Sequence, residues 1–167
     1  HHASADAPET GFHINMSGER KDACKFAIEG MFRFVQPAQG RATDWGWEIA
    51  PEVLGDLLIA LHDERPDLPI DVTENGIGLP DVPGPDGRID DQARITFVRD
   101  HLAAIHRAMA AGTNVRGYYL WSLLDNFSWI NGYKKRYGLF HVDRTTCART
   151  PKSSAFWYRD VSRNHGF

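Results

Sequence analysis

Glu74 offers a carboxylate for catalysis at a position where active-site residues are often found. Residues 70–76 read Ile-Asp-Val-Thr-Glu-Asn-Gly. Ile70 and Val72 indicate a buried strand, so Glu74 emerges where that strand leaves the core and the chain turns at Asn75-Gly76. In parallel α/β folds, active sites gather at this end of the strands. The other interpretation is an ordinary strand-ending carboxylate paired with an arginine, because acidic residues are common at turns.

Residues 122–138 form a connection that is rich in aromatic and cationic side chains. The C–H faces of sugar rings pack on flat aromatic groups, while hydroxyls and phosphates require polar donors. This composition therefore predicts a sugar or anion site. A loop anchored by Phe127 and Tyr133, with its cations in water, explains the same composition, and both interpretations stay open.

The elements that must position these residues alternate between short apolar runs and amphipathic helices, as in βα units on a parallel sheet. Three such units are predicted, with strands over residues 11–16, 70–74 and 115–121 and helices that begin at Pro51, at a cap formed by Asp90 or Asp91, and at Thr150-Pro151. The first two helices are expected to end before Pro66 and at Gly112. Residues 17–45 are irregular, apart from a predicted hairpin of residues 25–28 and 32–35.

Composition fits a globular protein of one domain, because the chain has 167 residues, 42% hydrophobic content and a net charge of -3. That charge does not favour nucleic acid as a partner. No apolar run approaches the roughly 20 residues that span a bilayer, and the first residues lack the apolar core of a signal peptide. A cytoplasmic location is expected, with residues 1–10 as a disordered tail.

The spacing of the cysteines and histidines gives no indication of a metal site or of redox chemistry. Cys24 and Cys147 lie far apart without metal-ligand spacing, and we expect both to be free thiols. The eight histidines are scattered along the chain without ligand spacing. No cofactor is therefore expected.

Five segments carry longer motifs that occur in a defined order: residues 43–52, 73–76, 121–127, 135–143 and 149–155. They closely resemble the carboxy-terminal part of glycoside hydrolase family 1, and the resemblance covers nearly all of residues 41–161. It implies a partial (β/α)8 TIM barrel of about the last three βα units, with residues 1–167 as a single incomplete barrel region. It also implies a retaining β-glycoside hydrolase in which Glu74 is the nucleophile and forms a covalent glycosyl-enzyme.

The chain departs from the family in lacking the Asn-Glu-Pro motif that carries the general acid/base. A complementary barrel portion could supply this group, and either that portion or self-association is the expected partner, because a partial sheet exposes unpaired edges. A catalytically silent barrel fragment is the alternative to an enzyme. The first strand departs as well: where the family has an Asn and a Tyr that orients the nucleophile, this chain has His13 and then Ile14 and Asn15. His13 is either a substitute hydrogen-bond partner or a structural histidine.

The resemblance also implies a substrate class. Family members that act on unphosphorylated sugars have a Glu where this chain has Ser128, and a carboxylate there would repel a phosphate. Ser128, Lys135 and Tyr137 match the pattern by which 6-phospho-β-glycosidases hold the phosphate, and Trp129 resembles the 6-phospho-β-galactosidase branch. We therefore predict 6-phospho-β-galactosides or 6-phospho-β-glucosides as substrates, with unphosphorylated β-glycosides as the alternative. Trp121 either lines the sugar pocket, as the resemblance implies, or is a core residue.

Overall fold

The computed structural model describes residues 3–4, 11–13, 25–28, 31–34, 41–43, 46–129 and 132–167. These fall into two compact units, one drawn from residues 1–50 and 128–134 and the other from residues 51–127 and 135–167. The single incomplete barrel region predicted for residues 1–167 stays a prediction. Within the described residues, no helix combines the length and the apolar character that crossing a membrane requires.

The first unit contains a sheet in the order β1-β4-β3-β2, and all its pairings are antiparallel. Its strands are β1 (Ala3–Ser4), β2 (Gly11–His13), β3 (Lys25–Ile28) and β4 (Phe32–Phe34). The predicted hairpin is confirmed by β3 and β4, which pair Ile28 with Phe32. Of the tail predicted over residues 1–10, the structure describes only β1, which pairs with β4.

The strand expected to open the parallel sheet is placed differently from the prediction. Its first residues form β2, whereas residues 14–16 lie outside the described part of the chain. Strand β2 pairs antiparallel with β3. An antiparallel partner lies nearby in sequence, whereas a parallel pairing needs a long crossover connection. The pattern of apolar residues did not indicate whether this strand would pair with an antiparallel or with a parallel partner.

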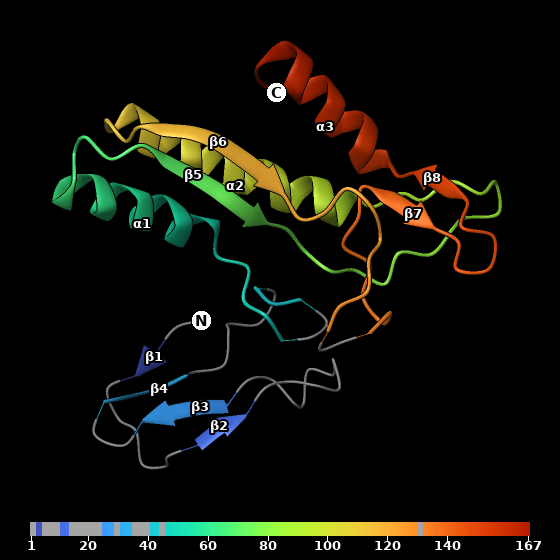
Figure 1. Cartoon of the computed structure of the whole chain (residues 1–167), viewed down its shortest axis with the longest axis horizontal. Coiled ribbons are helices and arrows are strands. Elements are labelled where there is room, and N and C mark those ends of the chain that lie inside the picture. Colours follow the sequence, from blue (N-terminus) through green and yellow to red (C-terminus); the bar gives the residue numbers. More distant parts are fainter. Residues whose placement is uncertain are drawn as a thin grey trace. The chain divides into compact units, whose positions relative to one another are not determined.

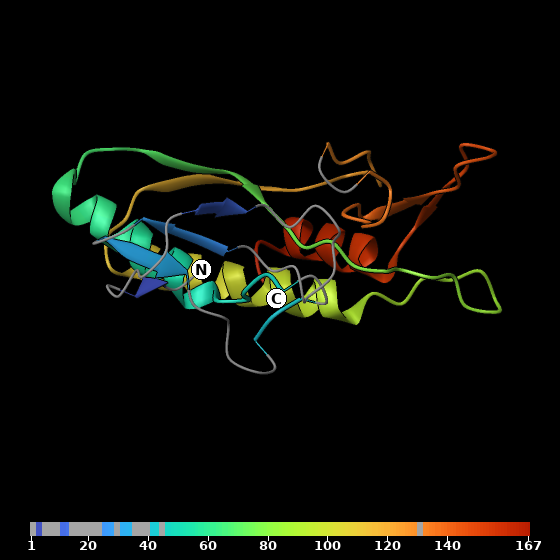
Figure 2. The same ribbon diagram turned by 90° about the horizontal axis from the view of Figure 1, so that it is seen from below.

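The second unit is an α/β structure built around two parallel strands, β5 (Ile70–Asn75) and β6 (Val115–Leu120). Helices α1 (Pro51–Glu64) and α2 (Gln92–Ala110) cover one face of this pair (Figures 1 and 2). The hydrophobic core consists of Leu58, Ile105 and Ala108, against which side chains of both strands pack, namely Ile70, Val72, Val115 and Tyr118. The predicted strands and helices of these two βα units are confirmed.

The ends of the helices follow the sequence signals, with one exception. Pro51 begins α1, Asp91 is the N-cap residue of α2, and Gly112 has a φ of 109° just beyond the end of α2. The prediction that Thr150-Pro151 opens the last helix is wrong. These residues belong to β8 (Arg149–Pro151), which pairs antiparallel with β7 (Phe140–Val142), and α3 spans Ser153–Asn164. Strand β8 belongs to a two-stranded sheet and is therefore an edge strand, where the missing N–H of Pro151 is tolerated.

Removing the central core side chain tests this packing. Leu58 is 2% exposed, so Leu58→Ala should reduce the free energy of unfolding by about 2–5 kcal/mol through the cavity it leaves. The matched control is Leu57→Ala on the same helix turn, since Leu57 is 54% exposed and should change stability far less. Urea unfolding of both variants measures the difference, and equal losses would contradict the assigned core.

Candidate active site

Glu74 lies near the carboxyl end of β5, and its side chain is exposed. The next residue, Asn75, fixes this end of β5 to β6. Its side-chain oxygen accepts a hydrogen bond from the Tyr118 hydroxyl at 2.8 Å, and its carbonyl accepts one from the Trp121 N–H at 2.9 Å. No arginine pairs with Glu74 within the described residues, so the structure gives no support to the interpretation as a paired surface carboxylate.

Gly76 allows the chain to turn directly against the end of β6. A Cβ atom on Gly76 would lie 1.9 Å from the Trp121 carbonyl oxygen, a distance that no side chain can occupy. The two segments therefore meet main chain to main chain. Trp121 is 41% exposed, which argues against a buried core residue, and its peptide bond to Ser122 is cis. Glu74 and Trp121 thus lie at the same end of the parallel pair.

Lys135 and Tyr137 lie on a segment that the structure brings to this end of β5. The N–H groups of Leu79 and Arg136 each donate to the other residue's carbonyl at 3.0 Å. A Cβ atom on Gly78 would lie 2.9 Å from the Tyr137 ring and 3.0 Å from the Lys135 Cβ atom, so both side chains pack against a bare backbone. Both side chains are buried.

Burial makes the Lys135 ammonium group lose its proton more readily than a lysine in water does. Desolvation by burial lowers the pKa of Lys135 from 10.5 to about 8. An anion that bound beside this group would favour the charged form and raise the pKa again. A buried ammonium of this kind is therefore suited to binding an anionic group.

The other predicted site residues belong to the first unit or lie outside the described residues. Ser128 and Trp129 belong to the first unit, where Ser128 and Gly132 exchange backbone hydrogen bonds of 2.9 and 2.7 Å. Trp129 is 94% exposed. His13 lies in β2, and Asn15 lies outside the described residues. Their predicted roles stay predictions.

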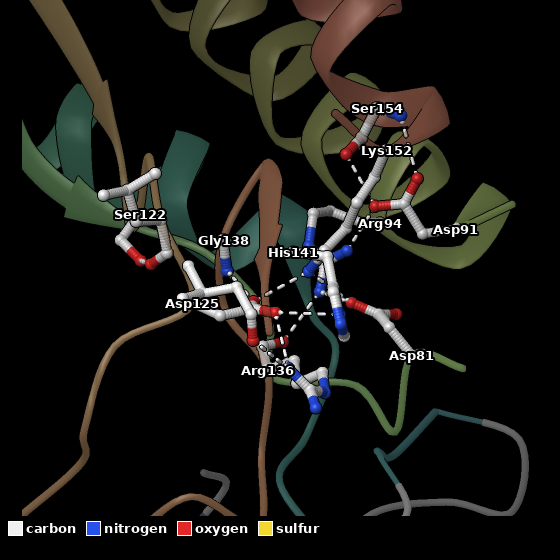
Figure 3. Close-up of polar contacts among 12 residues, drawn as sticks. Asp81, Asp91, Arg94, Ser122, Asp125, Arg136, Gly138, His141, Lys152 and Ser154 are labelled. Carbon is white, nitrogen blue, oxygen red and sulfur yellow. Dashed lines mark hydrogen bonds and ion pairs between the residues drawn. The ribbon is translucent and has the colours of Figure 1, made fainter. Parts of the chain in front are cut away.

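A chain of buried ion pairs, which the sequence did not predict, supports the loops beyond β5 and β6. Carboxylates and cations alternate along it in the order Asp91, Arg94, Asp81, Lys152, Asp125 and Arg136 (Figure 3). We call these six residues the ionic chain. The Lys152 ammonium lies at its centre, 2.6 Å from the Asp81 carboxylate and 2.8 Å from the Asp125 carboxylate.

The ends of the ionic chain are also hydrogen-bonded. Asp91, which caps α2 by position, accepts hydrogen bonds from the Ser154 N–H at 2.8 Å and the Ser154 hydroxyl at 2.6 Å at the start of α3. At the other end, Arg136 donates to Asp125 at 3.0 Å, and its own carbonyl accepts from Arg94 at 2.7 Å. The ionic chain thus joins the first turns of α2 and α3 to both loops.

The charges in the ionic chain balance, which makes their burial tolerable. Lys152 is fully buried and Arg94 is 1% exposed. Burial by itself would raise the pKa of Asp125, but the hydrogen bond and charge of Lys152, the Gly138 N–H and Arg136 together lower it. Burial and the nearby Arg136 lower the pKa of His141, whose ring lies 3.6 Å from Asp125. The three carboxylates are therefore matched by three cations.

One sequence signal could have revealed the ionic chain. Arg94 precedes Phe97 and Val98 by three and four residues, so it lies on the buried face of α2. A buried arginine requires carboxylate partners, and acidic residues such as Asp91 lie nearby in sequence. The partners from distant loops carry no such local signal. Within the described residues, no group of three or more His, Cys, Asp or Glu side chains could hold a metal ion.

Comparison with known proteins assigns this α/β structure and its motifs to a family. The family model described as Glycosyl hydrolase family 1 matches residues 10–167. The chain belongs to glycosyl hydrolase family 1.

Two curated relatives show how much of a family member the chain represents. The 6-phospho-beta-galactosidase of Streptococcus equi subsp. zooepidemicus strain H70 is 46% identical over 155 residues, which cover 92% of this chain and 33% of that protein. The 6-phospho-beta-galactosidase of Clostridium acetobutylicum is 44% identical over 163 residues, covering 97% of this chain and 34% of that protein. The chain thus spans about a third of the length of these relatives.

A solved structure supports the same conclusion. The family 1 β-glucosidase from Thermotoga maritima in complex with isofagomine lactam superimposes with a TM-score of 0.78 at 39% sequence identity. The match covers 81% of this chain and 31% of that one.

The lowered pKa of Asp125 predicts acid sensitivity. Because the folded-state pKa lies below the unfolded value, the contribution of Asp125 to stability is complete above about pH 4 and is lost as the pH falls through the folded-state value. Asp125→Asn should reduce the free energy of unfolding by about 3–5 kcal/mol at neutral pH, because it removes the carboxylate that pairs with Arg136 and leaves the buried Lys152 ammonium with Asp81 as its one remaining partner in the ionic chain.

Urea unfolding between about pH 6 and about pH 3 measures this effect. The parent chain should lose more stability over that range than Asp125→Asn does. The control is Asp160→Asn, whose exposed carboxylate pairs with the adjacent Arg159 and should leave the pH dependence unchanged. Parallel pH profiles of the parent chain and Asp125→Asn would contradict the prediction.

Proposed function

We propose that this chain forms the last three βα units of a (β/α)8 barrel and carries the nucleophile of a retaining β-glycosidase, Glu74. The position of Glu74 supports this proposal: its exposed side chain lies where parallel β5 ends beside Trp121, the end at which such folds carry their catalytic groups. The family match and the share of the relatives that the chain spans support it further.

The proposed reaction has two steps. The Glu74 carboxylate attacks the anomeric carbon, and a Glu74–sugar ester bond forms while the glycosidic C–O bond breaks and the leaving oxygen takes a proton from a second carboxylic acid. Water then attacks the anomeric carbon, loses its proton to that second carboxylate, and releases Glu74. In retaining enzymes the two carboxyl groups lie about 5–5.5 Å apart. By the family resemblance, the second carboxyl group comes from a complementary barrel portion.

The favoured substrates are 6-phospho-β-galactosides. The carrying observation is the fully buried Lys135 ammonium, which shares one segment with the buried Tyr137 phenol near the end of β5. These two groups would donate to a phosphate dianion, and Ser128 stays the further donor that the family resemblance predicts. Both 6-phospho-beta-galactosidase relatives are more than 40% identical to the chain.

The alternative substrate class is unphosphorylated β-glycosides. The structural match to a β-glucosidase favours this alternative. A silent fragment is the third option, and self-association through the open strand edges would accompany it. Within the described residues, β5 and β6 pair only with each other, so each offers an edge that a complementary portion could extend. The cytoplasmic location stays a prediction.

Hydrolysis assays test the proposed nucleophile. The chain is assayed by itself and after combination with the two-thirds of the Streptococcus relative that it does not match. We expect the combination to release p-nitrophenol from p-nitrophenyl β-galactoside 6-phosphate, and Glu74→Gln to reduce kcat by about 10³-fold or more. Glu64→Gln, an exposed residue at the end of α1, is the control.

Trapping identifies the nucleophile independently of turnover. A 2-fluoro glycoside should form an ester with Glu74 in the combined protein, and mass spectrometry of the digested chain locates the label. Labelling of another carboxylate, or full activity in Glu74→Gln, would rule out this role for Glu74. Activity that favours p-nitrophenyl β-galactoside over its 6-phosphate would overturn the proposed substrate class instead.

The buried ammonium predicts both selectivity and pH dependence. Lys135→Met should raise KM for the 6-phosphate by about 30-fold or more, because losing one partner of a buried charge pair costs about 2–5 kcal/mol. KM for the unphosphorylated substrate should change much less. Because the pKa of Lys135 is about 8 in the free chain, the ammonium is present below that pH, and the affinity for the 6-phosphate should fall above it.

Measuring KM for both substrates between about pH 7 and about pH 9 checks this prediction. Lys134→Met is the matched control, because Lys134 is the adjacent lysine and its side chain is exposed. The assignment fails if Lys134→Met and Lys135→Met weaken binding of the 6-phosphate equally.

A further inference from the structure

The segment that carries Lys135 and Tyr137 does not belong to a regular sheet. Its backbone hydrogen bonds to neighbouring segments form isolated pairs rather than a ladder. Arg136 pairs with Leu79, the Ser122 N–H donates to the Tyr137 carbonyl at 3.1 Å, and the Leu139 N–H donates to the Ser122 carbonyl at 2.9 Å. The neighbouring segments are loops themselves, beyond β5 and β6. Such contacts by themselves define the position of a side chain less rigidly than a sheet would.

Asp125 holds this segment on both sides of Tyr137. Its Oδ2 atom accepts a hydrogen bond from the Arg136 side chain at 3.0 Å, and its Oδ1 atom accepts one from the Gly138 N–H at 2.9 Å. These are the residues immediately before and after Tyr137. A Cβ atom on Gly138 would lie 2.3 Å from the Asp125 backbone nitrogen, so the two backbones are in direct contact.

The rest of the ionic chain holds Asp125 in turn. Lys152, the N-cap residue of α3, forms an ion pair with the Asp125 carboxylate. It forms a second ion pair with Asp81, which lies in the loop beyond β5. Arg94 of α2 reaches the Arg136 carbonyl at 2.7 Å. Two helices are thereby connected to the residues that flank Tyr137 (Figure 3).

We propose that Asp125 is a positioning residue, which acts through Arg136 and Gly138 to hold Lys135 and Tyr137 where they bind the substrate phosphate. The anion in this statement rests on the proposed function. The positioning rests on the contacts alone. Because the three carboxylates and three cations of the ionic chain balance, it fixes the segment without adding net charge near the phosphate.

Buried ion pairs are a physically reasonable means of fixing a geometry. They contribute little net stability compared with apolar groups of similar volume, because desolvation offsets most of the attraction. Their contacts depend strongly on direction and distance, however, and each charge must keep its partner. A displacement of about 1 Å in a binding group can reduce a rate about 100-fold. Precise placement of Lys135 is therefore the property that the ionic chain is suited to supply.

The test compares Asp125→Asn and Arg136→Gln with Leu58→Ala in the full chain. Asp125→Asn removes the central carboxylate, and Arg136→Gln is a milder change because that side chain is 23% exposed and should tolerate substitution. Leu58→Ala weakens the α1–α2 core and leaves every contact of the ionic chain in place. It separates positioning from a general loss of stability.

The first measurement is the pKa of Lys135, read by NMR from the ¹³Cε signal of labelled lysine and assigned with Lys135→Arg. We expect a value of about 8 in the parent chain and in Leu58→Ala. In Asp125→Asn and Arg136→Gln the value should rise toward 10.5 as the ammonium becomes exposed, with the smaller shift in Arg136→Gln. An unchanged Lys135 pKa in both variants overturns the proposal.

The second measurement is the affinity for galactose 6-phosphate relative to galactose, by calorimetry on the same proteins. Preference for the phosphorylated sugar in the parent chain and in Leu58→Ala, reduced about 10-fold or more in Asp125→Asn, supports positioning for the phosphate. If the parent chain does not prefer galactose 6-phosphate while the pKa of Lys135 still shifts in the variants, the phosphate assignment fails and the positioning of Lys135 stands.

Discussion

The contact of the Lys152 ammonium with the carboxylates of Asp81 and Asp125 is the interaction on which the candidate site depends. These groups come from the start of α3 and from the loops beyond β5 and β6, three places far apart in sequence. A buried ammonium must keep charged partners. The segments that carry Lys152, Asp81 and Asp125 therefore cannot separate without leaving a buried charge unpaired. The loops at the carboxyl ends of the strands are therefore constrained together, although neither is part of a sheet.

Much of the second unit followed from local sequence patterns. The strand signals around Ile70 and Val115 and the proline at Pro51 were sufficient to predict β5, β6 and the start of α1. The errors came where pairing partners decide the outcome. Thr150-Pro151 has the composition of a helix start, yet it pairs with β7, and β2 pairs antiparallel with β3. Local patterns do not specify which strand a segment meets.

The candidate site divides in the same way. The position of Glu74 at the end of an apolar strand made it a candidate, and the family motifs predicted a role for it and for Trp121, Lys135 and Tyr137; these roles stay predictions. The ionic chain was missed because an Asp in a loop looks the same in sequence whether water or a lysine surrounds it. Asp125 lies within the motif of residues 121–127, but its partner Lys152 lies 27 residues away and belongs to another element.

Three glycines near the candidate site leave no room for a side chain: Gly76 and Gly138 meet the main chain of Trp121 and Asp125, and Gly78 meets the side chains of Tyr137 and Lys135. Each of these glycines faces backbone or ring atoms at distances below 3.0 Å from where a Cβ atom would lie. The backbones of these segments therefore meet directly at Gly76 and Gly138, and peptide groups have the same shape in every sequence. A larger residue at Gly76 or Gly138 would require the two backbones to separate, so substitutions that alter binding without moving the backbone are confined to the neighbouring side-chain positions.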